Sequence, residues 1–180
     1  RDRRVRKTTN ALKHALTVLM QKKTIKDITV KELTDIADVN RGTFYLHYED
    51  VFDLLSQSEG DFFAKLREAV ELHSEDFMSG NPVPLFCGVY ELCRDNADLV
   101  SILIGENGDI LNQLKTFLRE KCLNDWSAIL RRQGIQHFDA YFSFIVGGCL
   151  SLLQYWFHGG MIESPEELAE ITGVFLAHHM

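Results

Sequence analysis

Residues 29–48, TVKELTDIADVNRGTFYLHY, constrain this chain more than any other stretch. Thr29 and Glu32 have the spacing of a capping box, in which the threonine hydroxyl accepts a hydrogen bond from the amide of Glu32 and the glutamate carboxylate accepts one from the amide of Thr29. Apolar residues follow at helical spacing, at Leu33, Ile36 and Ala37. The stretch therefore predicts a short helix that begins just after Thr29.

A second short helix is predicted after a very brief link. Val39 and Asn40 interrupt the first helix after about two turns, and Asn40 can cap a helix over residues 41–47. Phe44 is the residue that this helix would bury. Two short helices with so brief a link cannot lie side by side, so they cross steeply, and the pattern predicts a helix-turn-helix.

The second helix would present hydrogen-bond donors suited to nucleic acid. Arg41, Thr43 and Tyr45 fall at exposed positions and are our candidates for contacts with base edges. The candidates for phosphate contacts and for the start of the reading helix are Thr29, Lys31, Asn40, His47 and Tyr48. The competing interpretation is a helical hairpin with no role in nucleic-acid binding.

The run ITVKELTDIADVNRGTFYLHYED resembles the N-terminal domain of the TetR (tetracycline repressor) family of bacterial regulators, whose usual wording is close to T-x-x-x-I-A-x-x-A-G-V-S-x-G-T-x-Y-x-Y-F. The likeness covers roughly residues 8–57. Asn40 replaces the common Ser and remains a good cap, whereas Val51 stands where many members carry a Lys that contacts phosphate. The resemblance implies an all-α fold with a three-helix DNA-binding domain, residues 1–50, and a helical regulatory and dimerisation domain, residues 51–180.

The charge distribution agrees with a protein that touches DNA through one end. Residues 1–48 carry 11 Lys/Arg against 5 Asp/Glu, a net +6, and the remaining 132 residues carry 8 against 21, a net −13, which gives the chain total of −7. A basic head on an acidic body keeps the body from collapsing onto the duplex. The basic run at residues 1–7, RDRRVRK, either contacts phosphates or is merely solvated.

The rest of the chain has almost no strand-like alternation and predicts further helices. The expected helices are 51–73, capped by Asp50; 85–94; 97–104, capped by Asn96; and 109–132. By resemblance to the family, the 51–73 helix links head to body and moves when a ligand binds.

Residues 140–162, AYFSFIVGGCLSLLQYWFHGGMI, contain no Asp, Glu, Lys or Arg. This length could cross a membrane, but glycines and polar residues dilute the segment and no basic anchors flank it, so we expect no membrane span. We expect a helix covered on one side by its own core and on the other by a second copy, followed by a helix capped at Ser164 and Glu167. The predicted homodimer interface comprises Phe142, Val146, Gly147, Gly148, Leu150, Leu153, Phe157, Leu168, Ile171 and Phe175.

The resemblance implies a repressor that binds a palindromic operator in double-stranded DNA as a homodimer and is released by a small apolar effector. The residues expected around the effector are Phe62, Phe63, Leu66, Phe86, Tyr90, Cys93, Leu114, Phe117, Trp126, Tyr141 and Phe144. The alternative is a co-regulator with weak or no autonomous DNA binding that acts through a protein partner, which Val51 favours.

Enzymatic and metal chemistry have no support in the sequence. It contains no Gly-rich phosphate loop, no G-x-S-x-G and no H-E-x-x-H, so no catalytic residue and no cofactor are expected. The four cysteines form no C-x-x-C pair, and His178-His179 lacks a third ligand, so no metal site is expected. The sequence shows no signal peptide, and we expect a cytoplasmic protein.

Overall fold

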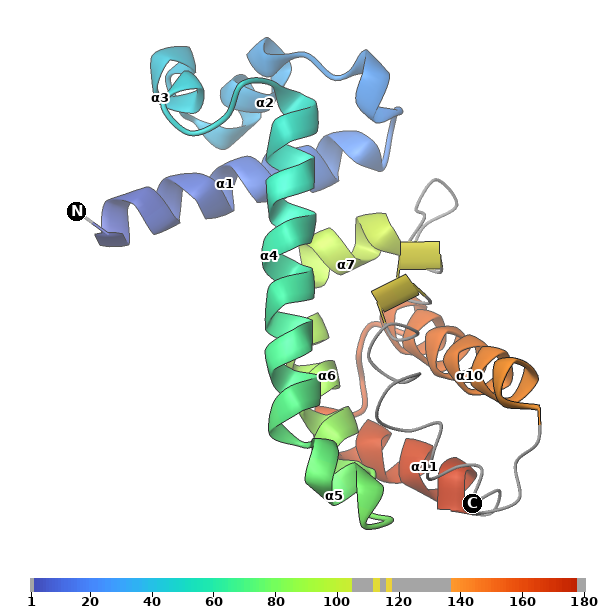
Figure 1. The fold of residues 1–180 in the computed structure, drawn as a ribbon. Coiled ribbons are helices and arrows are strands. Elements are labelled where there is room, and N and C mark those ends of the chain that lie inside the picture. The colour runs from blue at the N-terminus through green and yellow to red at the C-terminus, as the bar shows by residue number, and fades with distance from the viewer. Residues whose placement is uncertain (1, 105–111, 114–115, 118–136, 178–180) are drawn as a thin grey trace. The chain divides into compact units, whose positions relative to one another are not determined.

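The structure, a computed structural model, describes residues 2–104, 112–113, 116–117 and 137–177 of the 180-residue chain (Figure 1). The regular elements in these residues are all helical, which confirms the predicted all-α class. The chain forms two compact units, one made of Arg1–Lys65 and Asn96–Asn107 and the other of Leu66–Asp95 and Gly108–Met180. The predicted domain boundary at residue 50 stays a prediction.

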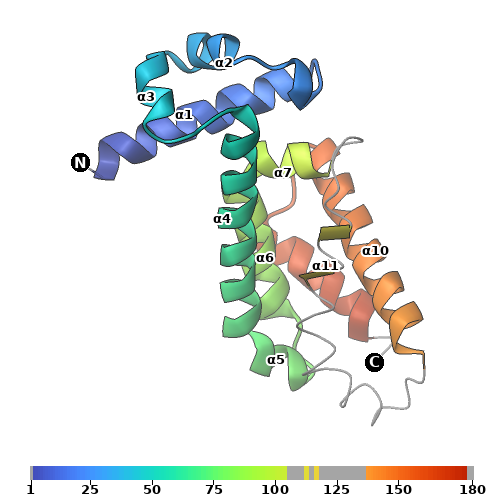
Figure 2. The same ribbon diagram turned by 45° about the horizontal axis from the view of Figure 1, so that its top comes forward.

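The first unit contains the predicted helix-turn-helix. Within it, α1 packs against α2 and α7, and α2 packs against α3 (Figures 1 and 2). The long helix α4 is continuous and contributes residues to both units. The elements are α1 (Asp2–Met20), the 3-10 turn η1 (Ile25–Asp27), α2 (Val30–Ala37), α3 (Arg41–Tyr45), α4 (Val51–Leu72) and α7 (Ala97–Leu103).

Apolar side chains from α1 to α4 form the core of the first unit. The spacing of the four α1 residues places them on one face of that helix, which is therefore buried. Ile102 of α7 packs against the same core. The core residues are Leu12, Ala15, Leu16, Leu19, Ile28, Leu33, Phe44, Tyr48, Val51 and Leu54.

Two polar contacts hold α1 against its neighbours in the first unit. His14 Nδ1 lies 2.7 Å from Asp98 Oδ2 of α7, and Lys13 Nζ lies 3.5 Å from Asp61 Oδ2 of α4. Both pairs are partly exposed, so each adds at most about 1 kcal/mol to stability. They chiefly fix which parts of α4 and α7 face α1.

The second unit contains α5 (Ser74–Met78), α6 (Val83–Asp95), α10 (Phe138–His158) and α11 (Pro165–Ala177), with α6 packed against both α5 and α11. The Thr172 hydroxyl donates to the Leu168 carbonyl, so the Tyr90 hydroxyl is the donor in the 2.8 Å contact between Tyr90 and Thr172. Trp156 is fully buried, its ring meets that of Tyr90 edge-on, and its Nε1 donates to the Glu163 carbonyl. These contacts join α6, α10 and α11.

Most of the predicted helix boundaries and caps are confirmed. The Asp53 amide donates to Asp50 Oδ1 at 2.8 Å, and the Ser164–Glu167 capping box is present at the start of α11. Asn96 does not cap α7, because its ψ of 33° departs from the extended backbone that an N-cap requires. The sequence did not predict α5, and the expected helix 109–132 lies almost entirely outside the described residues.

Helix α10 has two apolar faces, and the described residues of its own chain cover one of them. Asp139–His158 is long and apolar enough to cross a membrane, by length and composition only. One face, including Val146, Leu150 and Trp156, is buried in the second unit, and the opposite face, including Phe144 and Tyr155, is exposed. One face of α10 therefore packs on the core of its own chain, as predicted for this segment.

The residues of the predicted dimer interface differ in burial. Val146, Leu150, Leu153 and Leu168 are buried within the chain, and their part in an interface stays a prediction. The sequence could not separate these residues from the outward set, because α10 is apolar all round and periodicity alone gives no orientation. Of the other predicted members, Gly148, Ile171 and Phe175 are exposed, and Phe142, Gly147 and Phe157 are half-buried.

Candidate nucleic-acid interface

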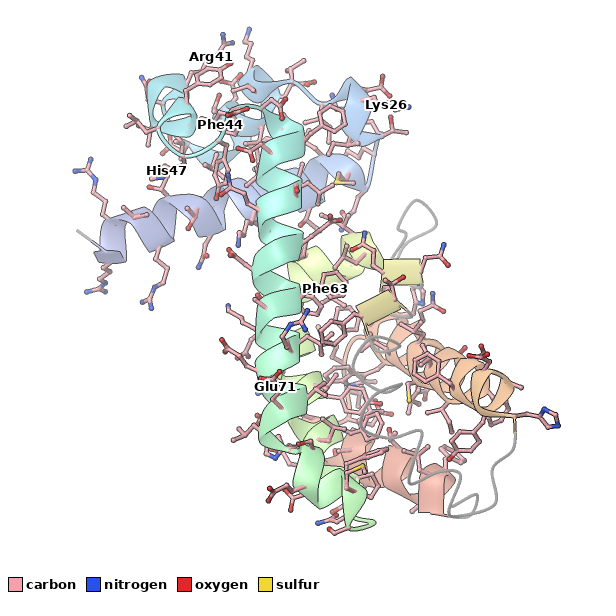
Figure 3. All side chains as sticks on the ribbon, viewed as in Figure 1. Lys26, Arg41, Phe44, His47, Phe63 and Glu71 are labelled. Atoms are coloured by element: carbon pink, nitrogen blue, oxygen red, sulfur yellow. The ribbon has the colours of Figure 1, made fainter. Side chains whose placement is uncertain are left out.

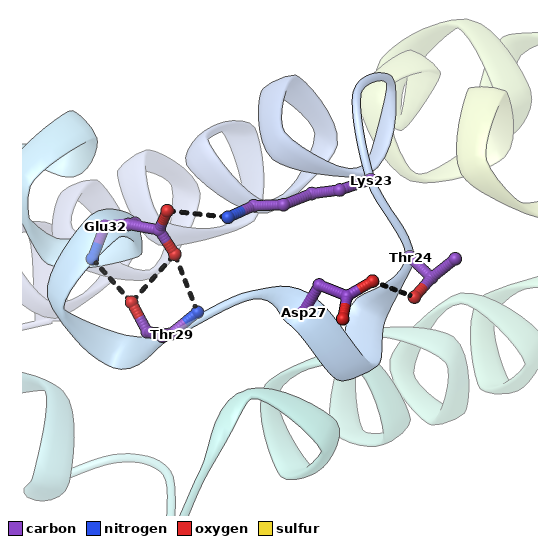
Figure 4. Close-up of polar contacts among 5 residues, drawn as sticks. All are labelled: Lys23, Thr24, Asp27, Thr29 and Glu32. Carbon is purple, nitrogen blue, oxygen red and sulfur yellow. Dashed lines mark hydrogen bonds and ion pairs between the residues drawn. The ribbon is translucent and has the colours of Figure 1, made fainter.

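The start of α2 is held by the predicted capping box (Figure 4). The Glu32 amide donates to Thr29 Oγ1 at 3.3 Å, and the Thr29 amide donates to Glu32 Oε2 at 3.0 Å. Lys23 Nζ donates to the other carboxylate oxygen at 2.6 Å. The hydrogen bond from Lys23, and then those from Thr29, lower the pKa of Glu32 from 4.5 to about 2. The entry to the helix-turn-helix is thus fixed by an ionised carboxylate.

The turn between α2 and α3 depends on one residue in the left-handed region. Asp38 ends α2 with φ 52° and ψ 47°, a conformation that Asp adopts more readily than most non-glycine residues. The Val39 amide still donates to the Thr34 carbonyl at 3.0 Å, which closes the turn. Asn40 then returns to extended backbone and begins the next helix.

Helix α3 is anchored on one side and open on the other (Figure 3). The Gly42 amide donates to Asn40 Oδ1 at 2.7 Å, which confirms the predicted cap. Phe44 is fully buried and its ring lies close to those of Tyr45 and Tyr48. The exposed residues of α3 and the residue just after it form one surface, which we call the reading face: Arg41, Gly42, Tyr45 and Leu46.

The predicted DNA-binding residues occupy three kinds of position. Lys31, Arg41 and Tyr45 are exposed and free to meet a ligand, and Thr43 and His47 are half-buried beside them. The side chains of Thr29 and Asn40 are exposed but act as helix caps. Tyr48 is only 6% exposed and belongs to the core, so its ring helps to hold α3 in place, and its contact with a phosphate stays a prediction.

Leu46 is a member of the reading face that sequence reasoning missed. Its side chain is 81% exposed, immediately after α3. Its spacing from the buried Phe44 indicates the exposed side of the helix, but the predicted contact residues are hydrogen-bond donors, and Leu46 is aliphatic. In a major groove, such a side chain can pack against thymine methyl groups.

The basic side chains near the reading face differ from two other basic side chains of the same unit in whether they have an acidic partner. Among the described residues, neither Lys31 nor Arg41 has an acidic partner within ion-pair distance, whereas Lys13 and Lys23 are paired internally. The site consists of a capped first helix, a tight turn and a second helix with one exposed face and unpaired basic side chains nearby. This arrangement defines the class of helix-turn-helix DNA-binding proteins.

Comparisons with known proteins place the chain within that class. The TetR model described as "Transcriptional regulator C-terminal region" matches residues 80–178, which is more than half of the chain. The chain therefore belongs to the TetR family of transcriptional regulators. An uncharacterized HTH-type transcriptional regulator of Bacillus subtilis, YxbF, is 37% identical over 59 residues, which are 33% of this chain and 16% of that protein. The chain thus matches only a small part of that relative's length.

Solved structures share the fold across nearly the whole chain. A TetR transcriptional regulator from Streptococcus agalactiae has a TM-score of 0.55 at 23% identity, covering 97% of this chain and 96% of the other. The fatty acid degradation regulator FadR of Bacillus halodurans has a TM-score of 0.62 at 13% identity, covering 94% of each chain. The dihydroxyacetone kinase operon activator DhaS has a TM-score of 0.54 at 17% identity, covering 96% of this chain and 94% of the other.

The residues predicted around an effector are spread over both units. Phe62 and Phe63 belong to the first unit, and Leu114 and Trp126 lie outside the described residues. In the second unit, Phe144 is 70% exposed, so it belongs to the outward face of α10 and does not line an interior cavity. The other second-unit members are buried or half-buried, and their role in a cavity stays a prediction: Leu66, Phe86, Tyr90, Cys93, Phe117 and Tyr141.

One group of metal-ligand types occurs among the described residues. The ligand atoms of Cys87, Glu91 and Glu166 lie within 4.8 Å of one another, on α6 and α11. Burial, together with Glu91 and Glu166, raises the pKa of the Cys87 thiol, which opposes formation of the thiolate that a metal requires. Both carboxylates are exposed, and exposed acidic groups commonly lie together without binding a metal.

Proposed function

We propose that this chain is a repressor that binds a palindromic operator as a homodimer in the cytoplasm. The observation that carries the proposal is the reading face of α3. It combines a free guanidinium, a phenol and an exposed aliphatic side chain on a helix whose other side is fixed by the fully buried Phe44. Arg41 suits guanine, Leu46 suits a thymine methyl group, and Lys31 on α2 suits a phosphate.

Selection of operator sequences from random duplexes tests this proposal. Arg41→Ala and Tyr45→Ala should each weaken operator binding by about 1–3 kcal/mol and relax the base preference at a few base pairs. Lys31→Ala should instead lower the affinity for all duplexes by a similar factor. Lys65→Ala is the matched control, because Lys65 is an exposed cation on α4 in the same unit. If Arg41→Ala binds the operator as tightly as the parent, α3 is not the reading helix. If the purified protein selects no sequence until host lysate is added, the co-regulator interpretation replaces ours.

The exposed apolar surface of α10 and α11 supports the homodimer. Phe144 and Tyr155 of α10 and Val174 and Phe175 of α11 are each more than half exposed, and Ile162 between the helices is 84% exposed. Large apolar surfaces of this kind mark protein interfaces. Two copies that pair through these helices would present two reading helices about 34–36 Å apart, one turn of DNA.

A single charge tests this interface. Gly148 is exposed on α10, and an added Cβ there would meet nothing within 4 Å, so Gly148→Glu should leave the protomer fold intact. We expect this variant to be monomeric by sedimentation and to lose operator affinity. Gly60→Glu is the control, because Gly60 is also an exposed helical glycine with nothing within 4 Å, but lies on α4. A monomeric parent at micromolar concentration would refute the dimer.

Release by a small apolar effector completes the proposal. Its support is the family and the aromatic character of the second unit, and α4 is the helix that continues from that unit into the first. An effector can shift operator binding only by its differential affinity for two states, typically about 1–3 kcal/mol. Linkage then requires operator DNA to weaken effector binding by the same factor. A compound that binds at saturation without changing operator affinity is not the inducer.

A further inference from the structure

One carboxylate of the first unit is half-buried and has no polar partner. Glu59, on α4, accepts no hydrogen bond and forms no ion pair with any residue that the structure describes. Two other acidic side chains of this unit are half-buried, but Glu32 is bonded to Lys23 and Asp53 to Gln57. Burial raises the pKa of the Glu59 carboxyl, and no hydrogen bond or neighbouring cation offsets this effect.

Glu59 lies within the apolar stripe of α4. At 100° per residue, Leu55 and Phe63 lie about 40° to either side of Glu59. Leu55 packs against the core of the first unit, and Phe63 is half-buried midway along the helix (Figure 3). The ring of Phe62, which is 4% exposed, meets that of Phe63 edge-on with 5.8 Å between the ring centroids. The carboxylate therefore has two aromatic rings one helical turn away.

The basic residues near this position do not neutralise the carboxylate. Lys13 of α1 reaches α4, but its Nζ lies 3.5 Å from Asp61 Oδ2. Lys65 is exposed and lies about 120° around the helix from Glu59. An ionised carboxylate that is partly removed from water without a partner is unfavourable. A cation from outside the chain would offset this cost.

The surroundings of Glu59 select the kind of cation. A bound metal ion requires several oxygen, nitrogen or sulfur ligands, and Glu59 belongs to no such group of side chains among the described residues. Aromatic rings, by contrast, attract organic cations through the negative faces of their π systems. A carboxylate beside aromatic and aliphatic side chains therefore suits an organic cation whose body is apolar.

We propose that Glu59 is the anionic end of an effector site on α4 for a small organic cation with an apolar body. The inference rests on the proposed effector release and narrows its chemistry, because the effector then carries one positive charge. That charge pairs with the Glu59 carboxylate, and Phe63, supported edge-on by Phe62, contacts the apolar body. Helix α4 contributes residues to both units, so a ligand held at Glu59 acts directly on the helix that they share.

Calorimetric titration of the full chain with two matched pairs of probes tests the site without DNA. Benzylguanidinium and benzylurea have nearly the same shape, as do benzyltrimethylammonium and neopentylbenzene, and only the first member of each pair is charged. The parent should bind the charged member of at least one pair ten-fold or more tightly than the neutral member. Glu59→Gln should remove this preference, because glutamine keeps the size of the side chain and loses its charge.

Glu68→Gln is the matched control, because Glu68 is an exposed carboxylate on the same helix, and this variant should keep the preference. Glu59→Gln removes a charge that has no partner, so its thermal unfolding, followed by circular dichroism, should begin no earlier than that of the parent. At saturation, the preferred charged probe should weaken operator binding by the parent by about 5–150-fold. The same probe should leave operator binding by Glu59→Gln unchanged.

The outcomes separate the inference from the function on which it rests. If neither charged probe binds the parent more tightly than it binds Glu59→Gln, the inference is overturned and operator binding stands. A charged probe that binds through Glu59 but leaves operator affinity unchanged at saturation would overturn the effector role. If the parent selects no operator, the proposed function fails, and the calorimetric preference for charged probes still decides whether Glu59 binds organic cations.

Discussion

Replacing Phe44 with Ala should strongly destabilise the first unit and weaken operator binding without altering the reading face directly. Phe44 is 0% exposed, and its ring centroid lies 5.4 Å from that of Tyr45 and 5.7 Å from that of Tyr48. Truncating a buried Phe costs about 3–5 kcal/mol. The unit contains 65 and 12 residues, 77 in all, so its whole stability is about 4–12 kcal/mol at 0.05–0.15 kcal/mol per residue. The substitution thus removes a large part of what holds α3 in place.

Amide hydrogen exchange measures this loss separately in each unit. Protection should fall in α2 and α3 and persist in α6 and α11, because the described core around Phe44 draws only on residues of the first unit. Phe52→Ala is the control, because Phe52 is 52% exposed on α4 and its truncation should change stability by about 0.5 kcal/mol at most. Phe44→Ala with the protection and operator affinity of Phe52→Ala would refute the anchoring role of Phe44.

Three further substitutions probe individual contacts. Glu32 has a pKa of about 2 in the folded chain, below its ordinary 4.5, so its contribution to stability is fully present above pH 4.5 and is lost as the pH falls through about 2. In the Glu32→Gln variant, the free energy of unfolding should therefore depend less on pH across this window. A pH dependence equal to that of the parent would contradict the capping role. Asn40→Ala should destabilise the first unit by about 1 kcal/mol in urea titrations and weaken operator binding, whereas an effect below experimental error would show that the cap is dispensable. Tyr90→Phe should cost about 1 kcal/mol, because it removes the donor to Thr172, and a more stable variant would argue against that hydrogen bond.

The features that the sequence predicted well are those that act over three or four residues. The capping boxes at Thr29 and Ser164, the cap at Asn40 and the buried Phe44 all appear where spacing placed them. Caps satisfy backbone groups of the adjacent turn, and helical periodicity relates near neighbours, so neither requires knowledge of distant contacts.

Only the tertiary structure decided which apolar side chains face inward and which distant segments meet. Helix α7 joins the first unit through Ile102 and through the contact between His14 and Asp98, residues 84 positions apart that no local pattern connects. Tyr48 is buried and Leu46 exposed, although both follow the same short helix, because the core lies on only one side of α3. On α10, apolar in every direction, one face is buried, with Trp156 against Tyr90 of α6 and bonded to the Glu163 carbonyl, and Phe144 and Tyr155 lie on the other face. An orientation of this kind depends on the neighbouring helices, and the residues of a single helix do not encode it.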